Sequence, residues 1–332
     1  MTMAIPGAFE YFSLGIFCMK KTSKSKLKVL PRPTETITLG EYAHQTIHEQ
    51  FHQMIKQEKH VLADKDPEHL HQMRVASRRL YTALQVFDSV IELPKPARAQ
   101  QVRSLTKVLG KLRDLDVQIA TLETDYQPDL EPQEQASIEQ VLTVLKHKRR
   151  KALAGTQDVL ARSRYQDLKL AYNAWLGAPC FTPLAQLSVV TALPDLLSPL
   201  LSILLLHPAW LIATENLSDE TMPILHDLRK ACKHVRYQAD FFVLFYGDTF
   251  KSWVAGMRSL QDSLGKLQDI QVLQELLAEI LPKGTELVGL NQAIQQHQQH
   301  ILSGWNTLRQ HYLERSLRYQ MHKMLLNPTA EE

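Results

Sequence analysis

The hydrophobic positions along most of this chain recur every three or four residues, the spacing that places them on one face of an α-helix. Within residues 71–87 the apolar residues fall on one side of a helical wheel drawn at about 100° per residue. They are Met73, Ala76, Leu80, Ala83, Leu84 and Phe87. Strict alternation of apolar and polar residues, the sign of a half-buried strand, is scarce. The pattern predicts an all-α fold.

The chain also aligns with itself at a constant offset. The segment HQMRVASRRLYTALQVF at 71–87 aligns with HDLRKACKHVRYQADFF at 226–242, and RSLTKVLGKLRDLDV at 103–117 aligns with RSLQDSLGKLQDIQV at 258–272. Both offsets are 155 residues, which predicts two copies of one helical unit. Each copy is expected to contain a basic helix, a short loop and a helix entered through LGKL. With flanking helices, including a separate pair at 133–155 and 158–176, each copy should form a bundle of about four helices.

The repeat also predicts how the chain is divided. A first helical repeat at 39–176 is expected to be joined to a second repeat at 217–326 by an apolar, Pro-containing connector at 177–216. Residues 1–38 and 327–332 are expected to be disordered.

Neither apolar stretch of the chain is expected to enter a membrane. The N-terminal stretch carries an acidic residue inside its apolar run and its lysine pair after it, unlike a secretory signal. The stretch 193–213 is interrupted by Asp195, Pro199 and Pro208, so we interpret it as a buried connector. The three cysteines are too scattered for a disulfide framework, which favours a reducing cytoplasm.

The formal net charge is only +3, so any anion site must come from local clustering of cations. Such clusters lie opposite the apolar stripe of each predicted basic helix. They consist of His71, Arg74, Arg78 and Arg79 in the first copy, and His226, Arg229, Lys230, Lys233 and Arg236 in the second. A solvated helix face normally mixes acids with bases, yet residues 71–87 contain no Asp or Glu. An anion, or a carboxylate from elsewhere in the chain, should therefore offset these charges.

The second helix of each copy extends the basic surface. Arg103, Lys107 and Lys111 lie there in the first copy, and Arg258 and Lys266 in the second. The copies are not equivalent, because Asp262 takes the place of Lys107. Asp114, Asp116 and Asp269 are expected to orient arginines of the neighbouring helix. Arginine forks and lysine ammonium groups suit phosphoryl oxygens, so the clusters predict a ligand with many phosphates.

These segments resemble the CHAD domain family, whose name refers to its histidines in an all-α fold. The matching stretches are HQMRVASRRL with LGKLRDLDV and HDLRKACKHVRY with LGKLQDIQV. The resemblance implies two bundles related by a pseudo-twofold axis, with basic helices facing a shared central groove or channel. It also implies binding of inorganic polyphosphate through the residues named above, and association with polyphosphate granules. Two positions depart from the family pattern. Tyr81 stands where many relatives carry another Arg, and His234 stands in the place of Arg79 in the second copy, which should weaken binding or tune it with pH.

Three other functions are alternatives to polyphosphate binding. HEQFH at His48–His52, with His44 one turn earlier, fits the HExxH pattern of zinc hydrolases or a simpler metal site, but a third ligand and a substrate-binding strand are not evident. Nucleic-acid binding would use the same cations, and weak competition by RNA or DNA is expected. Catalysis on the phosphate chain lacks a nucleophile motif or a carboxylate cluster on a loop. We therefore expect no enzyme activity and no cofactor.

Overall fold

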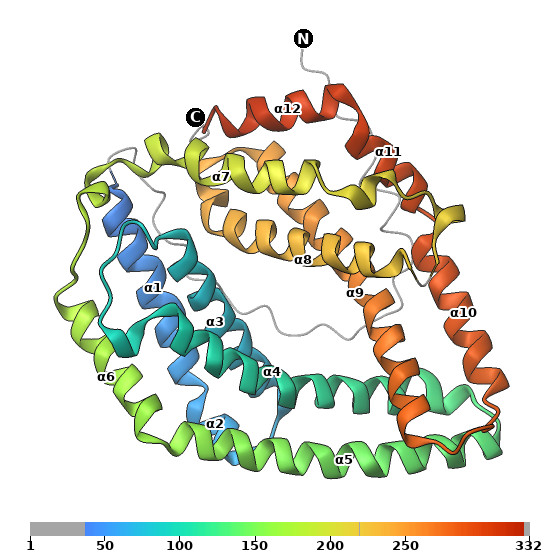
Figure 1. Ribbon diagram of the computed structural model, residues 1–332. Helices are drawn as coiled ribbons and strands as arrows, with labels where there is room; N and C mark the ends of the chain where they lie inside the picture. Colours follow the sequence, from blue (N-terminus) through green and yellow to red (C-terminus); the bar gives the residue numbers. More distant parts are fainter. Residues whose placement is uncertain (1–36, 219, 329–332) are drawn as a thin grey trace. The chain divides into compact units, whose positions relative to one another are not determined.

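The computed structural model describes residues 37–218 and 220–328 (Figure 1). In this part the chain forms helices joined by short 3-10 turns and contains no strand. Two isolated bridges, Thr38 to Ser188 and Ile91 to Phe181, are its only β-type pairings. The predicted all-α fold is confirmed. The disorder predicted for residues 1–36 and 329–332 concerns positions outside the described residues.

The α-helices of the described part follow one another with few long connections. Their bounds are α1 Leu39–Lys56, α2 Glu58–Ala63, α3 Pro67–Val86, α4 Ala99–Thr121, α5 Pro132–Ala161, α6 Ser163–Gly177, α7 Val189–Leu205, α8 Met222–Ala239, α9 Asp248–Ile280, α10 Val288–Leu302, α11 Trp305–Leu313 and α12 Arg315–Leu325.

Contacts along the chain define two compact units. The N-terminal unit comprises Thr38–Val189 and Ile270–Gln296, and the described residues of the C-terminal unit are 37, 190–218, 220–269 and 297–328. Residues 270–296, at the end of α9 and the start of α10, join the N-terminal unit through α5. There the Gly289 N–H donates to Glu134 Oε1 at 2.9 Å, and Lys148 Nζ lies 3.1 Å from Glu279 Oε1. The predicted pseudo-twofold axis and shared groove depend on how the two units are placed, and they stay predictions.

The N-terminal unit is built around α3, which packs against α1 and α4 (Figure 1). Helix α1 begins with a capping box, in which Thr38 Oγ1 accepts from the Glu41 N–H and the Glu41 carboxylate accepts from the Thr38 N–H. Helix α3 begins with Asp66 as its N-cap and Pro67 at its first position. All residues of the apolar stripe predicted for 71–87 are buried: Met73, Ala76, Leu80, Ala83, Leu84 and Phe87.

Helix α5 corrects the prediction of a break after Gly155. The structure has one helix to Ala161, and the chain turns only at Arg162, where the backbone is extended. Gly155 has open space around it, so nothing in its surroundings requires a turn. A helical glycine costs about 1 kcal/mol relative to alanine, and burial of Thr156 and Leu160 just beyond it offsets that cost.

Helix α7 shows how the apolar connector is built. The helix contains Pro194 and continues through Asp195 and Pro199, which were expected to interrupt the apolar stretch, and it ends at Leu205 before Pro208. One side is buried, and Trp210 stacks on Tyr312 with ring centroids 4.2 Å apart.

The other side of this stretch faces outward, with Leu206 and Leu211 at 76% and 71% exposure. The connector is therefore buried on one side only. By length and composition the stretch Val189–Leu211 would be able to span a membrane, and it is the one such stretch in the described residues.

Candidate anion-binding faces

The first basic face is formed by the cations and histidine of 71–87 on α3 and 103–117 on α4. Because the apolar stripe of α3 points inward, its basic residues lie on the opposite side of the helix. His71, Arg74, Arg78 and Arg79 are half-buried there, and Arg103, Lys107 and Lys111 on α4 are exposed. Helices α3 and α4 pack together, which brings the two sets to one pair of helices.

Arg74 lies flat against α4 at the position of a glycine. A Cβ atom added to Gly110 would lie 3.4 Å from Arg74 Nε, so the missing side chain leaves room for the guanidinium group. Arg74 Nη2 also lies 3.6 Å from Asp114 Oδ1. This contact confirms that Asp114 orients an arginine of the neighbouring helix.

The second basic face repeats this arrangement on α8 and α9. A Cβ atom added to Gly265 would lie 3.3 Å from Arg229 Nε. Arg229 and Gly265 are the 155-residue equivalents of Arg74 and Gly110. The sequence interpretation of LGKL as a helix entry was wrong, because α4 begins at Ala99 and α9 at Asp248. A glycine deep inside both helices was the signal that was missed.

Buried polar atoms recur at equivalent positions of the two faces without hydrogen-bond partners. Within the described residues, these are Nδ1 of His71 and Nε of Arg74 on the first face, and Nδ1 of His226 and Nε of Arg229 on the second. A buried donor or acceptor left unsatisfied costs about 1–3 kcal/mol. A solvated surface helix has no reason to repeat this free-energy cost at equivalent positions. In a binding site the cost can be offset when a ligand binds.

Both histidines are held in the neutral form. Burial lowers the pKa of His71, and the guanidinium groups of Arg113, Arg74 and Arg78 lower it further. Burial likewise lowers the pKa of His226, with additional effects from Lys230 and Arg229. An anion bound beside either imidazole would oppose these effects.

Arg236 does not lie on the exposed part of the second face. It is buried at 7% exposure, and its Nε donates to Gln261 Oε1 at 3.0 Å while Nη1 pairs with Asp240 Oδ2 at 3.1 Å. Its guanidinium group also lies 4.2 Å from the centre of the Tyr237 ring. These contacts give Arg236 a structural role between α8 and α9.

The remaining cations of the second face are accessible in part. Lys233 is half-buried on α8, and Lys266 is exposed on α9. Lys230 is exposed but pairs with Asp227 at 2.8 Å. Arg258 is 60% exposed, and its Nη2 lies 3.9 Å from Asp240 Oδ1.

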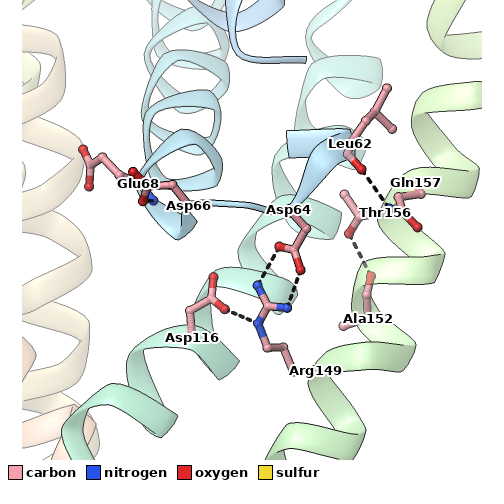
Figure 2. Close-up of polar contacts among 9 residues, drawn as sticks. All are labelled: Leu62, Asp64, Asp66, Glu68, Asp116, Arg149, Ala152, Thr156 and Gln157. Atoms are coloured by element: carbon pink, nitrogen blue, oxygen red, sulfur yellow. Dashed lines mark hydrogen bonds and ion pairs between the residues drawn. The ribbon is translucent and has the colours of Figure 1, made fainter. Parts of the chain in front are cut away.

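A separate ion cluster joins α4, which carries part of the first basic face, to α5. Figure 2 shows Arg149 of α5 paired through two nitrogens with Asp64, at 2.7 Å each, and through Nε with Asp116 of α4 at 2.6 Å. Asp116 was expected to orient arginines of the basic helix, and it instead holds α4 to α5. Asp64 contributes from the left-handed conformation after α2, with φ 47°, a geometry that the sequence pattern did not indicate.

The histidines of HEQFH lie along α1 in the N-terminal unit. The rings of His48 and His52 are 4.3 Å apart, while His44 Nε2 lies 2.9 Å from the Leu176 carbonyl oxygen and its ring lies near Trp175. Across the described residues, no group of three His, Cys, Asp or Glu side chains is placed to hold a metal ion. The described residues therefore provide no set of ligands for the zinc ion that the zinc-hydrolase alternative needs.

The fold and the two faces define an all-helical protein that presents the same basic helix pair twice. The family model of the CHAD domain matches residues 45–278, and the chain belongs to the CHAD domain family. The resemblance inferred from the sequence motifs is thereby confirmed.

Solved structures support the same fold. The crystal structure of the CHAD domain from the plant Ricinus communis is similar at a TM-score of 0.60 and 23% identity, covering 91% of this chain and 96% of that one. PptA from Streptomyces chartreusis is similar at a TM-score of 0.53 and 14% identity, covering 83% of this chain and 99% of that one. A comparison with curated proteins gave no match.

Proposed function

We propose that this protein binds inorganic polyphosphate, without converting it, through the two basic faces. The observation that carries the proposal is the recurrence of Arg74 over Gly110 and Arg229 over Gly265, each with unpartnered buried His and Arg atoms nearby. Polyphosphate is the ligand that the resemblance to the CHAD family implied. A long phosphate chain would supply the negative charge that residues 71–87 lack.

The chemistry of the faces suits a chain of phosphates. Arginine presents two N–H groups in a plane that matches two phosphoryl oxygens, while exposed lysines such as Lys107 and Lys111 add mobile positive charge. Release of counterions from a dense polyanion adds a favourable, salt-dependent contribution to binding.

Binding without chemistry is supported by the use already made of the nearest carboxylates. Asp114 pairs with Arg74, and Asp116 is held by Arg149. Asp116, buried and held at 2.6 Å, is poorly placed to bind a metal or to activate water, and Asp114 next to it is a single exposed carboxylate and not a cluster. The protein is accordingly proposed to act as a binding module, in the cytoplasm and at polyphosphate granules. Microscopy of a fluorescent fusion beside a polyphosphate stain tests the location, and diffuse fluorescence in cells with granules would contradict it.

The proposal is tested by titrating long-chain polyphosphate against the wild type and an Arg74→Ala, Arg78→Ala, Arg229→Ala, Lys233→Ala variant. We expect the variant to bind at least about 100-fold more weakly, since four cations are lost. The control variant Lys65→Ala, Arg150→Ala, Lys283→Ala, Lys323→Ala loses the same charge at exposed positions outside the faces. It should bind within about threefold of the wild type.

Two further titrations separate this proposal from its alternatives. Tighter binding of RNA than of polyphosphate by the wild type would favour nucleic-acid binding instead. Loss of binding in EDTA would show that a metal ion carries the interaction. Equal binding by a folded face variant and the control variant would refute the assignment of the faces.

A further inference from the structure

The two basic faces share their geometry but not their charge. The first face, counted over 71–87 and 103–117, contains seven Arg and Lys residues and two Asp, a formal charge of +5. The second face, counted over the aligned 226–242 and 258–272, contains six Arg and Lys residues and four Asp, a formal charge of +2.

The carboxylates of the second face contact its own cations. Asp227 pairs with Lys230 at 2.8 Å on α8. Asp240 lies 3.1 Å from Arg236 and 3.9 Å from Arg258, so one carboxylate is shared by two guanidinium groups. An incoming phosphate must therefore compete with carboxylates that already occupy these cations.

On the first face, one of the two carboxylates is directed away from the basic helices. Asp116 pairs with Arg149 of α5, which also holds Asp64 (Figure 2). Asp114 is the remaining carboxylate, and it is 66% exposed at 3.6 Å from Arg74. The Asp227–Lys230 pair of the second face is similarly exposed and similarly weak, so the faces differ in the number of their carboxylates and not in how tightly each exposed carboxylate is held.

Position 107 shows the difference most directly. Lys107 of α4 and its equivalent Asp262 of α9 are both exposed, so the same place on each face carries opposite charge. Burial raises the pKa of the Asp262 carboxyl, and the nearby cations Arg236, Arg258, Lys266 and Arg229 oppose this shift. Asp262 therefore screens charge on the second face where Lys107 adds charge on the first.

We propose that the first basic face, on α3 and α4, contributes most of the polyphosphate affinity and that the second face is a weaker, auxiliary site. This inference rests on the proposed function and adds which helices dominate it. The reason is electrostatic, since a face with more net positive charge releases more counterions for each polyanion that it binds. Carboxylates on the second face oppose the same ligand.

The test uses substitutions at equivalent, exposed positions. The first-face variant is Arg103→Gln with Lys111→Gln, and its control on the second face is Arg258→Gln with Lys266→Gln. Each removes two cations at the same two repeat positions. In polyphosphate titrations we expect the first-face variant to lose about tenfold in affinity and the second-face variant about twofold. Circular dichroism and thermal melting should show both variants folded as the wild type.

A pair of charge exchanges gives an independent measurement. Lys107→Asp should weaken binding by about tenfold or more, because it gives the first face the acid of the second. Asp262→Lys should strengthen binding by about threefold, because it removes a competing carboxylate.

Equal or larger losses in the second-face variant, or weaker binding by Asp262→Lys, would overturn the dominance of the first face while leaving polyphosphate binding intact. A wild-type protein that does not bind polyphosphate would overturn the proposed function, and this inference with it.

Discussion

At the scale of single residues, substitutions of the two glycines that contact Arg74 and Arg229 distinguish an effect on binding from an effect on stability. Gly110→Ala and Gly265→Ala would each improve helix propensity by about 1 kcal/mol but place a Cβ against Arg74 or Arg229. We expect polyphosphate affinity to fall about fivefold for Gly110→Ala and less than about twofold for Gly265→Ala, because the Cβ crowds each guanidinium group and the second face contributes less affinity. The free energy of unfolding should change by less than about 1 kcal/mol in both variants. Urea denaturation and titration measure the two quantities.

Gly155→Ala is the control for this prediction. Gly155 is also helical but has nothing within 4 Å, so alanine there should stabilise the protein by about 0.5–1 kcal/mol and leave affinity unchanged. If Gly110→Ala behaved like Gly155→Ala in both measurements, the packing of Arg74 on Gly110 would have no role in binding.

The two buried histidines predict a pH dependence. In the folded protein the pKa values of His71 and His226 lie below the usual 6.5, so the unfolded chain takes up protons first as the pH falls. The contribution of these histidines to stability is present above pH 6.5 and is lost as the pH falls through 6.5 toward the folded-state pKa. A bound polyanion raises both pKa values, so affinity should increase from pH 7 to pH 5.5.

The expected increase is about three- to tenfold, because each imidazole that becomes protonated adds one positive charge to its face. Titrations at several pH values should show it in the wild type. The variant His71→Gln, His226→Gln keeps the other histidines, so the difference between its pH dependence and that of the wild type is due to these two residues. An equally steep dependence in that variant would assign the effect elsewhere.

At the scale of elements, Arg149 of α5 pairs with Asp64 after α2 and with Asp116 of α4, so it joins three parts of the N-terminal unit. Arg149→Met leaves Asp64 and the buried Asp116 without their cation, and we expect the free energy of unfolding to fall by about 1–3 kcal/mol. The neighbouring Arg150→Met removes an exposed arginine and should change it by less than about 0.5 kcal/mol. Equal effects in urea denaturation would show that the cluster contributes no net stability.

The helices themselves could largely be predicted from the sequence, and their ends less so. The period of apolar residues identified the buried side of α3 correctly, because burial of Met73, Leu80 and Phe87 dictates that period. The break expected at Gly155 was wrong, because propensity is a small energy beside tertiary packing. The interruption expected at Pro199 was likewise wrong, because α7 accommodates this proline, and also Pro194, inside the helix.

The site was predictable where it depended on helical periodicity and not where it depended on contacts between distant segments. The repeat located His71, Arg74, His226 and Arg229 correctly on two equivalent helix pairs. The pairing of Arg149 with Asp64 joins residues 85 apart and needs a left-handed residue, so no local pattern indicated it. The burial of Arg236 did have a local signal, since Asp240 lies four residues later on the same side.

At the scale of the whole molecule, duplication preserved a packing arrangement and changed its electrostatics. Arginine over glycine is present in both halves, whereas the carboxylates differ at Asp227, Asp240 and Asp262. The net charge of +3 for the whole chain does not show that the two faces differ in charge. The difference is seen when the two halves are aligned at their offset of 155 residues.

The carboxylates of the second face also have a consequence for rates. When a phosphate leaves Lys230 or Arg258, Asp227 or Asp240 is already in place to take over the cation, so departure exposes no bare charge. Dissociation from that face should therefore be fast. If the first face binds polyphosphate as proposed, a chain held there should dissociate more slowly than one held on the second face.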